Sequence, residues 1–165
     1  MLNQLASDNP LKACFWDYHV VLIQSTKVVK KGKQVIQAQV SDIDTRLPFP
    51  CALEEYLDGT FNSKFADKKD ERKFAPLFRV VRAEYYLENF YSDRMHMIKD
   101  GVWLAKPPSY DCITTSNMKM NKKGHLSSLD DYVTMSKKSR IEENAWLGEV
   151  LTLQQLKLKF GLSNY

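Results

Sequence analysis

The strongest hydrophobic signal in the chain is a run of aromatic and β-branched residues from Cys14 to Ile23. A run of this kind predicts a β-strand. Residues 34–40 alternate apolar and polar side chains, which is typical of a half-buried strand. Because the polar stretch Lys30-Lys31-Gly32-Lys33 separates the two segments, the pattern predicts an antiparallel hairpin.

The middle of the chain mixes helical and extended patterns. Residues 51–57 predict a short helix that ends at Asp58-Gly59, and residues 77–83 predict a third strand. Residues 84–91 carry an apolar stripe with helical spacing. We expect an irregular segment over residues 92–123, and a loop of that length is usually functional or held by packing.

The last third of the chain contains two helix-start signals. Residues 128–135 predict a helix capped by its first residue, Ser128, and the charged residues 137–143 predict a linker. Thr152-x-x-Gln155 is the pattern of a capping box, and it predicts a helix through residue 160 with Gly161 as its C′ residue. Helices and strands are mixed and a hairpin stands at the front, so we expect an α+β fold.

Length and composition narrow the class of protein. The 165 residues are 44% hydrophobic and 27% charged, which is ordinary for a single globular domain, and we expect it over residues 13–165 after a flexible segment at 1–12. The net charge of +4 is too small and too dispersed to indicate nucleic-acid binding. The longest apolar run, Val20 to Ile23, is far shorter than the ~20 residues of a membrane span. Residues 1–12 lack the apolar core of a secretory signal.

Cysteine and histidine spacing argues against disulfides and metals. The three cysteines, Cys14, Cys51 and Cys112, are an odd number without C-x-x-C spacing, which favours a reducing compartment. The three histidines have neither i, i+4 spacing nor a neighbouring cysteine cluster. We therefore expect no metal and no other cofactor.

His19 is the residue in the first predicted strand that most needs an explanation. An imidazole inside an apolar strand requires a hydrogen-bonding partner. A hairpin turn centred between Lys30 and Lys31 would place it opposite Asp42, and a two-residue turn at Lys31-Gly32 would place it opposite Asp44. Either register gives a base beside an orienting carboxylate, which is half of a nucleophilic triad. A core histidine paired with a carboxylate for structural reasons is the alternative.

A triad also needs a nucleophile, and the cysteines are weak candidates for it. Cys14 lies five residues before His19, so alternation places the two on opposite faces of a strand. Cys51 begins a predicted helix, where a thiol pKa is lowered, but a buried cysteine is more often structural. Cys112 lies in the long irregular segment, where spacing predicts no position.

Several sequence blocks, in order along the chain, resemble the protein N-terminal glutamine amidohydrolase family. The first two are Trp16-Asp17-Tyr18-His19-Val20-Val21-Leu22 and Asp42-Ile43-Asp44-Thr45-Arg46-Leu47-Pro48-Phe49-Pro50-Cys51. The others are Phe78-Arg79-Val80-Val81-Arg82-Ala83, Asn89-Phe90-Tyr91-Ser92-Asp93-Arg94-Met95-His96-Met97, Lys106-Pro107-Pro108 with Tyr110 and Cys112, Ser116-Asn117-Met118-Lys119-Met120-Asn121, and the tail from Gly148 to Gly161. Together they cover the chain from about Phe15 to Gly161 and are jointly specific.

The resemblance implies a papain/transglutaminase-like α-β-α sandwich around an antiparallel sheet. It implies hydrolysis of the side-chain amide of N-terminal glutamine to glutamate and ammonia, a step of the N-degron pathway, by a Cys-His-Asp triad. The family's histidine falls on His19 and its aspartate on Asp42, which favours the register that places these two opposite one another. The family carries its cysteine upstream of the first strand, in a C-x-x-Y-C-E-E-N-x-W-like motif on an N-terminal helix. We expect that this chain lacks the helix and motif and is inactive by itself.

The same resemblance implies a protein substrate with a free α-ammonium group. Asp17 shares the predicted strand face of His19 and is a suitable acceptor for that group, and Trp16 is a candidate for lining the substrate pocket. We expect proteins or peptides with N-terminal glutamine as partners, no nucleic acid or membrane, a monomer, and a cytoplasmic and also nuclear location. Two alternatives are a pseudoenzyme that binds N-terminal residues without hydrolysis, and a basic protein that binds nucleic acid through Lys27–Lys33 and Lys119–Lys123.

Overall fold

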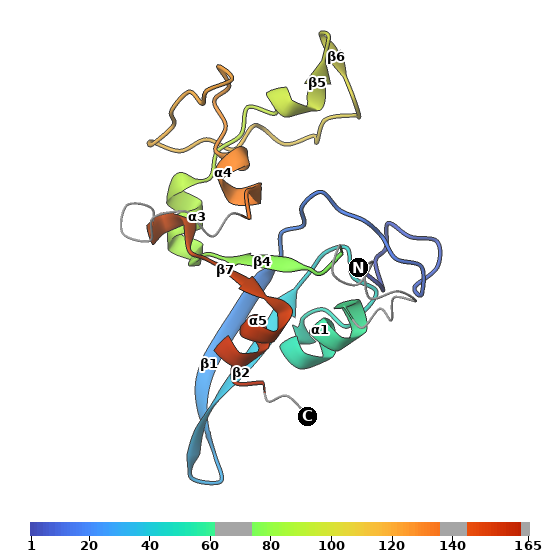
Figure 1. The fold of residues 1–165 in the computed structure, drawn as a ribbon, viewed down its shortest axis with the longest axis vertical. Helices are drawn as coiled ribbons and strands as arrows, with labels where there is room; N and C mark the ends of the chain where they lie inside the picture. Colours follow the sequence, from blue (N-terminus) through green and yellow to red (C-terminus); the bar gives the residue numbers. More distant parts are fainter. Residues whose placement is uncertain (62–73, 136–144, 163–165) are drawn as a thin grey trace. The chain divides into compact units, whose positions relative to one another are not determined.

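The structure, a computed structural model, describes residues 1–61, 74–135 and 145–162. These residues belong to two compact units, one formed by 1–77 with 152–165 and the other by 78–151 (Figure 1). The first unit contains the long hairpin and the helices α1 and α5, and the second contains α3 and α4. The single domain expected over residues 13–165 stays a prediction.

The predicted hairpin is confirmed as the main feature of the first unit. Strand β1, Leu22–Lys30, pairs antiparallel with β2, Lys33–Ser41, and the short β3, Cys51–Ala52, pairs with the other edge of β2. Lys30 and Lys33 face one another across the two-residue turn Lys31-Gly32. Both turn residues have positive φ, 51° and 75°, which is the backbone twist that a tight hairpin turn favours.

The first strand begins later than the sequence predicts. Residues 14–21 lie outside any strand, and the side chains of Phe15 and Val20 are 68% and 61% exposed. The cause lies in the partner strand, because Asp42 begins a turn in which its Oδ1 accepts the backbone N–H of Asp44 at 2.9 Å. Among the described residues, no strand continues beyond Ser41 beside residues 14–21. The expectation that Asp17 and His19 share a strand face is therefore wrong.

Helix α1, Leu53–Phe61, continues through Asp58-Gly59, where the sequence predicts its end. Gly59 packs closely there, because a Cβ atom would lie 3.0 Å from a methyl group of Leu47. The residues before the helix, Cys51 and Ala52, form β3 instead of its first turn. The breaker signal of Asp-Gly is thus overridden by tertiary contacts.

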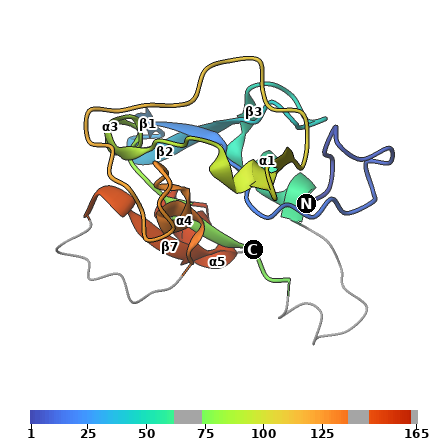
Figure 2. The same cartoon turned by 90° about the horizontal axis from the view of Figure 1, so that it is seen from above.

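Helix α5, Leu153–Lys159, has the predicted capping box: Gln155 N donates to Thr152 Oγ1 at 3.3 Å, and Thr152 N to Gln155 Oε1 at 2.9 Å. Gly161 follows with φ 72°, as expected for a C′ glycine. α5 lies beside α1, and the Lys157 ammonium is 2.6 Å from Asp58 Oδ1 (Figures 1 and 2). The core between these elements is apolar and buried: Val40, Cys51, Leu53, Tyr56, Leu57 and Leu156.

The second unit is built from short elements. Strand β4, Leu77–Val80, is paired with β7, Glu149–Thr152, which the sequence analysis did not predict. The helices are α3, Ala83–Asn89, and α4, Leu129–Val133, and 3-10 helices span Met95–Met97 and Ala145–Leu147. The expected irregular segment also contains a small antiparallel pair, β5, Ile98–Lys99, and β6, Val102–Trp103.

Hydrogen bonds of Arg79 and close packing at Gly148 hold the second unit together. The Arg79 guanidinium donates to the carbonyl oxygens of Tyr132 and Leu147, each at 2.9 Å. Gly148 has φ 63°, and a Cβ atom there would lie 1.9 Å from Val80 O, so only glycine fits. Ser128 stands at the start of α4, but its hydroxyl donates to Asn89 O at 3.0 Å instead of capping the helix.

The observed elements agree with the predicted α+β class. Helices and antiparallel strand pairs are both present, whereas the three-layer sandwich stays a prediction. The linker predicted at residues 137–143 lies outside the described residues. In the described parts of the chain, no helix combines the length and apolar character that crossing a bilayer requires.

Candidate active site

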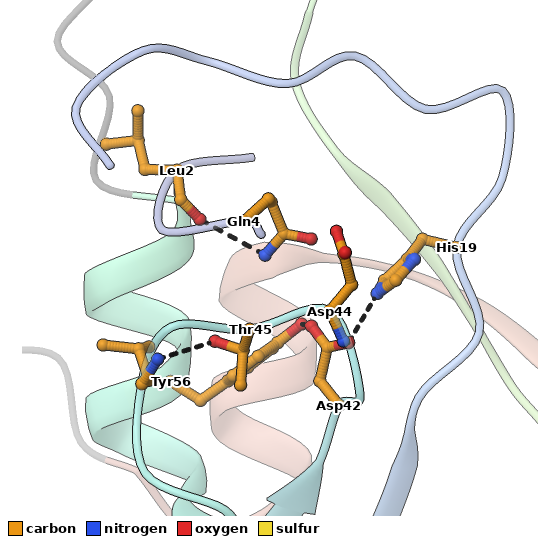
Figure 3. Close-up of polar contacts among 8 residues, drawn as sticks. Leu2, Gln4, His19, Asp42, Asp44, Thr45 and Tyr56 are labelled. Carbon is orange, nitrogen blue, oxygen red and sulfur yellow. Dashed lines mark hydrogen bonds and ion pairs between the residues drawn. The ribbon is translucent and has the colours of Figure 1, made fainter. Parts of the chain in front are cut away.

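His19 and Asp42 lie together in the first unit, at the base of the hairpin (Figure 3). His19 Nε2 is 2.8 Å from Asp42 Oδ1, within hydrogen-bonding distance. His19 belongs to the irregular segment just before β1, and Asp42 follows directly after β2. The hairpin therefore brings His19 and Asp42 together at its open end, although neither residue belongs to a strand.

The hairpin register differs from the one that the resemblance favoured. The turn at Lys31-Gly32 is the one for which a continued ladder would place Asp44 opposite His19. The ladder does not continue that far, because β1 begins at Leu22 and β2 ends at Ser41. The inference of the other register from the resemblance is thus wrong, while the pairing of His19 with Asp42 is present.

The contact with Asp42 determines which nitrogen of the imidazole is free. In neutral imidazole one nitrogen carries the proton, and Nε2 is the one that faces the carboxylate. Nδ1 forms no hydrogen bond with any of the residues that the structure describes. Trp16 stacks on the imidazole, with ring centroids 5.0 Å apart and planes 28° apart. Asp42 thus fixes the Nε2 edge of the imidazole and Trp16 packs on one of its faces, while Nδ1 has a lone pair that can accept a proton.

The Asp42 carboxylate is buried and well satisfied. Its side chain is 1% exposed, Oδ1 accepts from His19 and from Asp44 N, and Oδ2 accepts from the Tyr56 hydroxyl at 2.8 Å. Burial acts to raise the pKa of Asp42, but the Asp44 N–H, the Tyr56 hydroxyl and His19 outweigh it and hold the pKa below its ordinary value. The group is therefore an anion at neutral pH.

Tyr56 is the site residue that sequence analysis missed. Its side chain comes from α1, fourteen residues after Asp42, and is 2% exposed. Burial and the charge of Asp42 raise the pKa of Tyr56, so the phenol stays a hydrogen-bond donor. No local pattern marks this residue, since a tyrosine on the apolar face of a helix has the same signature whether or not it meets a carboxylate.

Residues 1–12, expected to be flexible, are hydrogen-bonded to the turn beside the pair. Gln4 is fully buried, and Leu5 N donates to Asp44 O at 2.6 Å. Arg46 N donates to Asn3 O at 2.7 Å, and the Arg46 guanidinium donates to Gln4 O at 3.2 Å. Backbone bonds thus tie this segment to the turn that carries Asp42.

Two buried acceptors beside the pair lack a donor among the described residues. They are Gln4 Oε1 and Asp44 Oδ2. The Gln4 amide is fixed by its Nε2, which donates to Leu2 O at 3.3 Å, and Figure 3 shows this amide and the Asp44 carboxylate pointing toward one another. A buried acceptor without a partner is costly, so the site has hydrogen-bonding capacity for a donor from outside these residues.

None of the other candidate residues has a hydrogen bond or ion pair with His19 or Asp42 in the described parts of the chain. Asp17 is exposed and forms no hydrogen bond or ion pair with the described residues. Cys51 is buried, and burial followed by the charge of Glu55 raises the pKa of its thiol, which is unfavourable for a nucleophile. Cys112 belongs to the second unit and is exposed. Cys14 lies in the segment before β1 and is half-buried. Within the described ranges, no three His, Cys, Asp or Glu side chains are grouped to hold a metal ion.

A histidine beside a buried carboxylate, with its second nitrogen free, has the geometry that the base and the orienting residue of a nucleophilic triad require. The chain matches the family model for N-terminal glutamine amidase over residues 1–160. It therefore belongs to the N-terminal glutamine amidase family.

Curated relatives agree with this assignment. The chain is 41% identical over 152 residues to the protein N-terminal glutamine amidohydrolase of Bos taurus, with 91% of this chain and 62% of the relative covered. The Homo sapiens protein of the same name is 41% identical over 151 residues, with 90% and 62% covered, and the Danio rerio protein is 36% identical over 148 residues, with 89% and 62% covered. The chain thus spans 62% of the length of these relatives.

Proposed function

We propose that this protein acts in the hydrolysis of the side-chain amide of N-terminal glutamine in proteins, giving N-terminal glutamate and ammonia. His19 is the base, and Asp42 holds its imidazole in the Nε2–H tautomer. The observation that carries the proposal is the 2.8 Å contact between Nε2 and Asp42 Oδ1, which leaves Nδ1 free to take a proton. The family membership supplies the substrate class.

The proposed reaction has two steps. His19 Nδ1 accepts the proton of a cysteine thiol, the thiolate attacks the glutamine side-chain carbonyl, and His19 gives the proton to the leaving ammonia. Water, deprotonated by His19, then attacks the thioester, and the thiol is restored with release of the glutamate side chain. The ionised Asp42 stabilises the imidazolium that forms in each step.

The thiol in this proposal belongs to the C-E-E-N-type motif that the resemblance implies, and none of Cys14, Cys51 and Cys112 stands in such a motif. Cys51 is disfavoured by its burial and its raised pKa. Cys14 and Cys112 stand where the family has no nucleophile. We propose that the 165-residue chain does not turn over substrate by itself.

Substrate recognition in the proposal involves the segment before β1. Trp16, which stacks on His19 and is 39% exposed, lies against the substrate, and the exposed carboxylate of Asp17 accepts from its α-ammonium. We further propose a papain/transglutaminase-like sandwich for the complete protein. It would be a monomer that acts on N-degron substrates in the cytoplasm and also in the nucleus.

Ammonia release from a peptide with N-terminal glutamine tests the proposal. The 165-residue chain should release none, and a chimera that adds the part of the bovine relative not matched by this chain should be active. In that chimera His19→Ala should lower kcat at least about 10⁴-fold, whereas His96→Ala, an exposed histidine of the second unit, should leave it unchanged.

Turnover by the isolated chain, or a chimera indifferent to His19→Ala, would refute the proposed mechanism. The alternative function, non-catalytic binding of N-terminal residues, is favoured by the burial of Cys51 and the raised pKa of its thiol. It predicts an inactive chimera, together with binding of glutamine-first peptides by the 165-residue chain.

A further inference from the structure

Each oxygen of the Asp42 carboxylate has its own set of donors. Oδ1 accepts from His19 Nε2 at 2.8 Å and from Asp44 N at 2.9 Å, whereas Oδ2 accepts from the Tyr56 hydroxyl at 2.8 Å. Two of the three donors come from the segments on either side of the hairpin, and the third comes from α1. Tyr56 is thus the link between the pair and the helical core of the first unit.

We infer that Tyr56 is a positioning residue: its hydroxyl fixes Asp42 Oδ2 so that Oδ1 is presented to His19 Nε2. The expected effect of Tyr56 on catalysis rests on the proposed function. The orientation of the Asp42 carboxylate by Tyr56 does not depend on that function. Tyr56 acts on the base through Asp42, because it has no contact of its own with the imidazole among its hydrogen bonds.

The physical reason is the freedom of a carboxylate about its last torsion. The Cβ–Cγ torsion of aspartate has a broad profile, so hydrogen bonds determine where each oxygen points. If the Tyr56 donor were lost, Oδ2 would be buried without a partner, in a side chain that is 1% exposed. The carboxylate would then turn to share the remaining donors, and the alignment of Oδ1 with Nε2 would be lost.

Tyr56 is held rigidly enough to fulfil this role. Its neighbours on α1, Leu53 and Leu57, are 1% and 2% exposed, and its ring meets the Phe61 ring edge-on with centroids 6.4 Å apart. Burial and the charge of Asp42 raise its pKa, so the hydroxyl proton stays in place over the working pH range.

Within the described ranges, four ionisable residues lie close to the contact between Tyr56 and Asp42. His19 and Asp44 face Asp42 from the segments flanking the hairpin. Cys51 of β3 lies near the phenol, and Glu55 of α1 acts on that thiol. Removal of the Tyr56 hydroxyl therefore changes the hydrogen bonding of Asp42 without changing the charge of the site.

The test is Tyr56→Phe in the 165-residue chain, followed by NMR. The Asp42 carboxyl carbon, titrated by ¹³C NMR, should show its pKa raised by about one unit, a tenfold higher proton affinity, because a bond to the charged form has been lost. The imidazole ¹⁵N shifts of His19 should show a smaller Nε2–H fraction. In the active chimera the same variant should lower kcat and leave KM unchanged.

Tyr91→Phe is the matched control. Tyr91 is 9% exposed, and in the second unit its hydroxyl donates to Lys119 O at 3.0 Å and accepts from Lys119 N at 3.1 Å. This variant loses the hydrogen bonds of a buried phenol to neutral groups and should leave both signals of the site unchanged. If Tyr56→Phe lowers Tm as Tyr91→Phe does but leaves the Asp42 pKa and the His19 tautomer unchanged, Tyr56 is merely structural and the inference is overturned.

A measurement on the unmodified chain covers the case in which Tyr56→Phe does not fold. The ¹H NMR signal of the Tyr56 hydroxyl proton should appear at low field, and its chemical shift should change at the pH where Asp42 titrates. A chemical shift that stays constant through this titration overturns the inference. Both readouts are independent of turnover. An inactive chimera with the expected NMR results would remove the proposed function and leave the positioning role intact.

Discussion

Removing the Asp42 carboxylate should destabilise the first unit by a predictable amount. Asp42→Ala leaves the buried Tyr56 hydroxyl without its acceptor, and a hydrogen bond to a charged group contributes about 1.5–3 kcal/mol. The Asp44 N–H is only half-buried and reaches water more easily, and the His19 side chain is 14% exposed, so these two contacts add about 1 kcal/mol together. We expect a loss of about 3 kcal/mol in the free energy of unfolding at pH 7.

Urea unfolding followed by circular dichroism measures this loss, and tryptophan fluorescence, to which Trp16, Trp103 and Trp146 contribute, follows the same transition. The pH dependence has a definite sign. The pKa of Asp42 is lower in the folded protein than its ordinary value of 3.8, so the stabilisation is fully present above that value and disappears as the pH falls through the lower folded pKa. The difference between wild type and Asp42→Ala should therefore shrink in acid.

Asp58→Ala is the control, because it removes an aspartate whose side chain is 55% exposed from its pair with Lys157 in the same unit. It should cost less than about 1 kcal/mol. A loss below about 1 kcal/mol for Asp42→Ala, or a loss that does not depend on pH, would show that the carboxylate is not held as the hydrogen bonds indicate.

The remaining predictions concern packing and caps. Gly148→Ala should unfold or strongly destabilise the second unit, by more than about 3 kcal/mol, because the new Cβ would lie 1.9 Å from Val80 O; a thermal melt that keeps its midpoint contradicts this. Thr152→Ala removes the capping box with Gln155 and should cost about 1 kcal/mol in chemical denaturation, whereas Thr152→Ser should restore most of it. Leu156→Ala, at a site that is 1% exposed, should cost about 2–5 kcal/mol, and a loss under 1 kcal/mol would mean that α5 is not packed as described.

Local patterns predicted the parts of the fold that depend on neighbours in sequence. The presence of the hairpin and the capping box at Thr152 follow from residues within a few positions of one another, whereas the turn at Lys31-Gly32 was one of two that the residues left open, and the resemblance favoured the other. The start of the first strand could not be predicted in this way, because residues 14–21 have strand propensity but lose their partner where Asp42 turns the chain. A segment forms a β-strand only where a neighbouring strand pairs with it, and the sequence pattern of the segment does not show whether such a neighbour is present.

The same distinction applies to the site. The sequence predicted a partner for His19, because an imidazole in an apolar segment needs a hydrogen bond and either hairpin register places a carboxylate, Asp42 or Asp44, opposite it. The residue that completes the carboxylate's hydrogen bonds, Tyr56, comes from a separate helix and carries no signal in the sequence. Gln4 was likewise unforeseen, because its burial depends on backbone bonds between residues 1–12 and the turn after β2.

The length of the hairpin separates its tip from the chemistry at its base. Nine paired residues lie between the turn at Lys31-Gly32 and the site, which at ~3.4 Å per residue is about 30 Å. An epitope or fluorophore inserted at the tip would therefore leave the register at Leu22 and Ser41 untouched, since each rung below it is held by its own backbone bonds. The tip is a natural attachment point for immobilising the protein or reporting on it while the site remains unmodified.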